Sequence, residues 1–153
     1  MRLALFGCLL LGGCGNANLK GHYWNLSLQG DEDDCTGAAA NYTEKLEYRV
    51  NIEGNEVALA VEQDEFATGN VNGCSISYES VIWEEVRGDF EIRWKIYGSA
   101  VVNVGGGQSC QPLNGTDWDG TEVFEVISSD DPEISPGCEY SMSLSGKYIE
   151  EVK

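Results

Sequence analysis

Apolar and polar residues alternate along most of this chain with a period of two, and this pattern constrains the fold more than any other feature. In the segment 45–52, Leu46, Tyr48 and Val50 alternate with charged side chains. In the segment 90–97, Ile92 and Trp94 alternate with charged side chains in the same way. Residues two apart lie on the same face of a β-strand, so each segment predicts a strand with one buried face. No segment shows the longer period of an amphipathic helix, and we therefore expect an all-β protein.

Turn-forming residues divide the chain into seven or eight such segments. The predicted strands are 21–29, 45–52, 56–62, 66–71, 75–85, 90–104, 122–127 and 139–149. The segment 75–85 has apolar residues on both faces, which a bulge or two buried faces would explain. Strands at near-regular spacing predict a single antiparallel up-and-down meander of about eight strands. We expect it to close as a barrel, with a sandwich as the alternative.

Charge and composition exclude several classes of protein. The 153 residues include 26 acidic and 9 basic side chains, which gives a net charge of −17. A field of this sign repels nucleic acids and anionic membrane surfaces. Hydrophobic residues make up 42% of the chain, enough for a core of one domain. We expect a monomer that binds no nucleic acid and no cofactor.

The first 14 residues have the layout of an export signal. Arg2 precedes a short apolar run that ends in Leu11-Gly12-Gly13-Cys14. This segment resembles the signal peptide and lipobox of bacterial lipoproteins. The resemblance implies cleavage after residue 13 and lipidation of Cys14, for example by palmitate. It also implies outer-membrane localisation, because Gly15 rather than Asp follows the cysteine. The alternative is an ordinary signal peptide in which Cys14 is incidental.

These features predict four regions. We expect a signal peptide at 1–13, a lipidated tether at 14–20, an antiparallel β-domain at 21–149 and a tail at 150–153. Contact with the membrane would be made through the N-terminal lipid, on the periplasmic side or at the cell surface.

Four further cysteines lie far apart in the domain. Cys35, Cys74, Cys110 and Cys138 contain no Cys-x-x-Cys pair. An even number behind an export signal predicts two disulfides, and structural zinc is the alternative. If the strands alternate in direction, Cys35 and Cys138 fall at one end of the barrel and Cys74 and Cys110 at the other. We therefore predict the pairs Cys35–Cys138 and Cys74–Cys110 from the three possible connectivities.

The first predicted strand begins Gly21-His22-Tyr23-Trp24. Together with the expected meander, this start is similar to the lipocalin-like barrels, although one extra residue separates the glycine from the tryptophan. In that family the barrel mouth holds a small apolar ligand. The resemblance therefore implies a binding role for this chain.

One acidic segment is a candidate cation site. Asp117, Asp119 and Glu122 look like the opening of a calcium loop, but the segment is too short for an EF-hand. A solvated acidic turn is the reading we favour, so we predict no metal site.

The tryptophans are the other candidate ligand contacts. Trp24 and Trp94 lie on inward faces of predicted strands, whereas Trp118 lies between two aspartates in a predicted turn. Trp118 is the aromatic we consider the best candidate for exposure and for contact with a ligand, a glycan or a partner, although the interpretation we favour is that it caps one end of the barrel.

Catalysis is not expected, because the chain has a single histidine, His22, and no Gly-x-Ser-x-Gly motif. These observations predict a non-catalytic binding module, for a small apolar ligand inside or an envelope protein or glycan at the loops. The alternatives are a structural envelope lipoprotein with a solid core and, more distantly, a hydrolase.

Overall fold

The computed structural model describes residues 20–36, 41–62, 64–103 and 117–153. These residues form strands without helices, as predicted. The strands are β1 (Gly21–Asp33), β2 (Thr43–Glu53), β3 (Glu56–Val61), β4 (Asp64–Asn72), β5 (Ser75–Ser80), β6 (Trp83–Arg87), β7 (Phe90–Asn103), β8 (Asp117–Ser129) and β9 (Glu139–Val152). No helix of a length and hydropathy suited to crossing a membrane occurs within these ranges.

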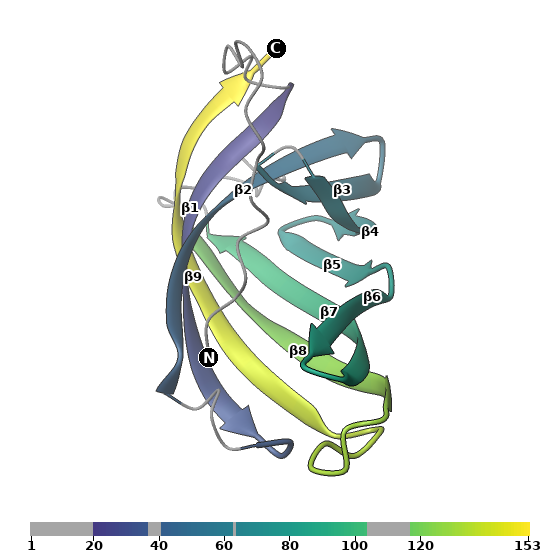
Figure 1. Ribbon diagram of the computed structural model, residues 1–153. Helices are drawn as coiled ribbons and strands as arrows, with labels where there is room; N and C mark the ends of the chain where they lie inside the picture. Colours follow the sequence, from purple (N-terminus) through teal and green to yellow (C-terminus); the bar gives the residue numbers. More distant parts are fainter. Residues whose placement is uncertain (1–19, 37–40, 63, 104–116) are drawn as a thin grey trace, which may run out of the picture.

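The sheet closes into an antiparallel barrel of eight strands, as predicted. Neighbouring strands of the nine-stranded sheet follow the order β5-β4-β3-β2-β1-β9-β8-β7-β6. The pairing of β5 with β7 closes a ring of eight strands, and β6 pairs with β7 outside this ring. The first and last strands pair along almost their whole length, from Gly21 opposite Val152 to Asp33 opposite Tyr140. Figure 1 shows the long strands β1, β9, β8 and β7 side by side along one wall.

The predicted strand 75–85 is two strands, β5 and β6. Both pair antiparallel with β7, at Tyr97–Val101 and at Phe90–Trp94 respectively, so they run in the same direction. They are separated by Val81 and Ile82, which are 71% and 44% exposed. The break explains the apolar residues on both faces of this segment, because these two side chains do not enter the core.

Strands β8 and β9 are longer than predicted. The expected turn at Asp117–Gly120 is the start of β8, and it pairs with both β7 and β9. The predicted tail likewise belongs to β9 up to Val152, because β1 supplies hydrogen-bonding partners for it. Both predictions were wrong for one reason: pairing partners distant in sequence extend a strand through residues that otherwise favour turns.

Inward-facing residues of the eight barrel strands build the main core. Trp24 and Trp118 lie within it, with ring centroids 5.4 Å apart in an edge-to-face arrangement. The candidacy of Trp118 as an exposed aromatic in a turn was wrong, since only 2% of this residue is accessible. A smaller cluster near one end of the barrel contains Ile92, Trp94, Val126 and Ile134.

The disulfide Cys35–Cys138 is present, as predicted, and joins the segment after β1 to the residue before β9. Both cysteines pack against the smaller cluster. Asp33 orders the approach to Cys35, because its Oδ1 accepts the backbone N–H groups of Cys35 and Thr36, each at 2.8 Å. Cys14 and Cys110 lie outside the described residues, so lipidation and the Cys74–Cys110 pair stay predictions.

Candidate functional site

Three inward-facing side chains that are neighbours across adjacent strands are partly exposed, although residues two positions away on the same faces are buried. We call these three side chains a row. The row crosses β7, β8 and β9 and contains Ile96, Phe124 and Tyr140, which are paired neighbours. Within β8, Glu122 and Val126 lie two residues away on the same face and are 1% and 0% exposed. Phe124 lies between these two buried side chains and still retains accessible surface.

Four aromatic side chains form a continuous wall at this level, which we call the aromatic wall: Trp83, Trp94, Phe124 and Tyr140. The rings of Phe124 and Tyr140 are stacked, with centroids 4.5 Å apart and an interplanar angle of 8°. Trp94 meets Tyr140 edge to face at 5.4 Å. Trp83 stacks on Trp94 at 6.1 Å. Phe124 and Tyr140 also contact the main core, so the wall connects the two clusters.

A carboxylate on β6 fixes the orientation of the wall. Glu85 Oε2 accepts the indole N–H of Trp94 at 3.0 Å, and Glu85 Oε1 accepts the Nε–H of Arg87 at 2.8 Å. The hydrogen bond satisfies the polar edge of a buried tryptophan, which would otherwise cost about 1–3 kcal/mol. Glu85 therefore holds the Trp94 ring against Tyr140.

Negative charge surrounds the phenol of Tyr140. Burial is the largest cause that raises the pKa of this group, and the carboxylates of Glu85, Asp33 and Glu122 raise it further. A carboxylate raises a phenol pKa because it disfavours a second negative charge nearby. The aromatic wall therefore lies in a negative field.

A buried carboxylate lies next to the partly exposed row. Glu122 Oε1 accepts the hydroxyl of Tyr48 at 2.8 Å and the hydroxyl of Tyr78 at 2.6 Å. Burial raises the pKa of Glu122, and the two tyrosine hydrogen bonds oppose this shift. Burial and the neighbouring Glu122 also raise the pKa values of Tyr48 and Tyr78 well above the usual range. These three groups form a hydrogen-bonded unit that crosses the barrel from β2 and β5 to β8.

A glycine makes room for this unit. An added Cβ at Gly98 would lie 2.0 Å from Cζ of Tyr78, so the Tyr78 ring packs directly over the backbone of β7. A side chain at this position would push the tyrosine hydroxyl away from Glu122.

The raised pKa of Glu122 predicts a pH-dependent difference between the wild-type protein and Glu122→Gln. The folded chain keeps the proton to higher pH than the unfolded chain, so the contribution of this group is complete below its ordinary pKa of 4.5. It is lost as the pH rises from there toward the raised value. Relative to the wild type, Glu122→Gln should therefore gain stability as the pH rises above the ordinary carboxyl pKa of 4.5. Urea unfolding at a series of pH values measures the difference, and a constant difference would contradict the assignment.

The partners of Glu122 are not evident from the sequence, where the residue is at most a weak candidate calcium ligand. In the structure Glu122 has the same parity in β8 as Trp118 and faces inward. An acidic residue at an inward position of a predicted strand is the signal that could have revealed this unit.

The three candidate calcium ligands do not converge. Asp119 is exposed, Asp117 pairs with Lys147, and Glu122 lies on the opposite face of β8. Within the described ranges, no group of three or more histidine, cysteine or acidic residues is arranged for a metal ion.

Two of the tryptophans predicted as ligand contacts lie deep in the barrel. The indole N–H groups of Trp24 and Trp118 are buried and have no hydrogen-bond partner among the described residues. Of the three tryptophans predicted as contacts, Trp94 alone lies in the aromatic wall.

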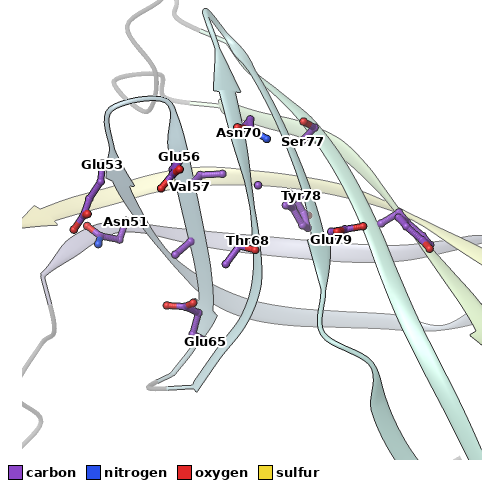
Figure 2. Close-up of a pocket in the computed structure, with 13 residues that line it drawn as sticks. Asn51, Glu53, Glu56, Val57, Glu65, Thr68, Asn70, Ser77, Tyr78 and Glu79 are labelled. Atoms are coloured by element: carbon purple, nitrogen blue, oxygen red, sulfur yellow. The ribbon is translucent and has the colours of Figure 1, made fainter.

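Two shallow grooves, each lined about equally by polar and apolar surface, lie on the outer face of the described strands. The first, of about 830 Å³, crosses β2 to β5 and reaches Tyr97 of β7 (Figure 2). Exposed polar side chains such as Glu56, Thr68 and Glu79 line it. The second, of about 810 Å³, crosses β2, β1, β9 and β8 around Lys45 and Lys147. Neither groove includes a residue of the aromatic wall.

Comparison with protein-family models, with curated proteins and with solved structures found no match for this chain.

Proposed function

We propose that this chain is an exported, lipid-anchored and non-catalytic binding module that takes a small apolar ligand against the aromatic wall. The observation that carries the proposal is the partial exposure of Ile96, Phe124 and Tyr140 between buried rows of the barrel interior. Ligand sites are typically lined by apolar and aromatic side chains with a few polar groups that fix orientation. The aromatic wall, with Glu85 at its edge, has this composition.

Two observations support export and anchoring. Residues 1–14 have the order of a lipoprotein signal, and Cys14 is the residue that would carry the lipid. The disulfide Cys35–Cys138 suits an oxidising compartment such as the bacterial periplasm or the cell surface. The lipid would attach the domain to the outer membrane, whereas its acidic surface would not.

A structural envelope role is the second candidate. Trp118 contacts both Trp24 and Tyr48 edge to face, and all three help to fill the main core. A solid core suits a protein without an internal ligand. Binding measurements separate the two candidates.

We expect the neutral apolar fluorophore N-phenyl-1-naphthylamine to bind the mature protein and to fluoresce more strongly when bound. Tyr140→Ser should weaken this binding about tenfold, because it removes the ring that contacts both Phe124 and Trp94. The measurement is a fluorescence titration, with a thermal melt of each variant to verify folding. Phe124→Leu, which keeps an apolar side chain, is a milder second variant.

Tyr97→Ser is the matched control, because Tyr97 lies on β7 and is 39% exposed at the outer groove. It should leave the titration unchanged. Absence of binding to the wild type would overturn the proposal in favour of the structural role. Weaker binding by Tyr97→Ser alone would place the ligand in the outer groove and would equally overturn it.

A further inference from the structure

We infer that the ligand of the aromatic wall is an organic ammonium ion, that is, an apolar body carrying a positively charged nitrogen. The inference rests on the proposed function and specifies the ligand class for the same site. It follows from the combination of ring faces and carboxylates around one partly exposed level of the barrel interior.

Aromatic rings are the first part of the argument. A cation over the face of a tryptophan, tyrosine or phenylalanine is attracted by the ring quadrupole, and cages of such rings recognise quaternary ammonium groups. The wall brings together two tryptophans, one tyrosine and one phenylalanine in continuous contact. Tyr140, at its centre, has the same parity in β9 as the buried Met142 and Leu144 but is only partly buried.

Carboxylates are the second part. Glu85 Oε2 accepts the indole N–H of Trp94 at 3.0 Å, which places one carboxylate at the edge of the wall, and both Glu85 and Asp33 raise the pKa of Tyr140. Glu85 is also bound by the guanidinium of Arg87, with Nε 2.8 Å from Oε1. Asp33 Oδ1 accepts the backbone N–H groups of Cys35 and Thr36. An ammonium ion would compensate the remaining negative field, whereas an anionic ligand would add to it.

The charge of the whole chain acts in the same direction. A net charge of −17 raises the local concentration of cations and lowers that of anions. Among amphiphilic small molecules, those with a positive nitrogen are therefore favoured over carboxylates or sulfonates before they reach the wall.

The test is displacement of bound N-phenyl-1-naphthylamine from the mature protein by three competitors of similar size. These are benzyltrimethylammonium, its neutral carbon isostere neopentylbenzene, and the anion phenylacetate. We expect the cation to displace the fluorophore at about tenfold lower concentration than the isostere, and phenylacetate to be the weakest competitor.

Glu85→Gln tests which charge is responsible. The amide oxygen can still accept the N–H of Trp94, so the wall keeps its hydrogen bond while the charge is lost. We expect the cation to lose about tenfold in affinity while the neutral fluorophore binds as before. Glu79→Gln is the matched control, because it also removes a carboxylate from an ion pair, here with Lys95, but on the outer face.

The outcomes separate the two proposals. If the fluorophore binds but the cation and its isostere compete equally, the ammonium inference is wrong and the proposed function remains. The same holds if Glu79→Gln and Glu85→Gln reduce cation binding equally, because the effect is then one of net charge. If the fluorophore does not bind, both proposals are wrong.

Discussion

Replacing both Cys35 and Cys138 by serine should reduce the free energy of unfolding by about 4–5 kcal/mol. The disulfide joins residues separated by 103 positions, so its removal releases a loop that spans most of the domain. On the chain-entropy model, a cross-link across about 100 residues contributes about 4.7 kcal/mol through restriction of the unfolded chain. This is a large fraction of the total stability of a typical domain, which is about 5–15 kcal/mol.

Urea unfolding followed by tryptophan fluorescence measures this effect. The double substitution is preferred over a single one, since a single serine would leave a thiol able to exchange with the other cysteines. The wild type treated with a reductant should unfold at a urea concentration no higher than that of the double variant, because reduction also breaks the predicted Cys74–Cys110 disulfide. A loss below about 1 kcal/mol in the double variant would show that the unfolded chain does not gain the freedom that the model assumes.

Trp118→Ala should cost about 3–5 kcal/mol, because truncation of a buried tryptophan removes its transfer free energy and leaves a cavity. Trp118 is 2% exposed and contacts Trp24 at 5.4 Å and Tyr48 at 6.4 Å between ring centroids. The neighbouring Tyr48 also holds Glu122, so the cavity would loosen a polar unit as well as the apolar core.

Trp83→Ala is the matched control for this prediction. Trp83 is only partly buried and contacts one aromatic neighbour, Trp94, so its removal should cost less than that of Trp118. Both variants are compared by urea unfolding, with circular dichroism to verify the strand content. Equal costs would mean that Trp118 does not carry more of the core than Trp83.

The strands could be predicted because their pattern is local. Alternation in segments such as 45–52 and 90–97 assigns each side chain to a face without knowledge of its partners. The direction of successive strands then placed Cys35 and Cys138 at the same end, and the disulfide confirms this. A meander that closes as a barrel also brings its last strand beside its first, and β1 does pair with β9.

The candidate site could be predicted only in part. Trp94 was named from its inward position, but its contacts come from Glu85 on β6 and Tyr140 on β9. The break at Val81 and Ile82, which creates β6 and brings Glu85 to the wall, shows in the sequence only as apolar residues on both faces of 75–85, and a bulge or two buried faces would explain these equally well. The position of the break depends on the pairing of β5 and β6 with different parts of β7.

Trp118 shows where local reasoning fails. Aspartates and a glycine around it favour a turn, yet pairing with Val102 and Gly146 draws it into β8 and buries it. Its inward parity was hidden because the strand was predicted to start at Glu122.

The sequence by itself determined the all-β class, the inward face of most strands and the position of one disulfide, because strand periodicity and cysteine placement are properties of short segments. Only the tertiary structure decided that Glu122 meets Tyr48 and Tyr78, which lie 74 and 44 residues away, and that Ile96, Phe124 and Tyr140 remain partly exposed inside the barrel. Register and closure bring these groups together, and both depend on pairing between segments far apart in the chain.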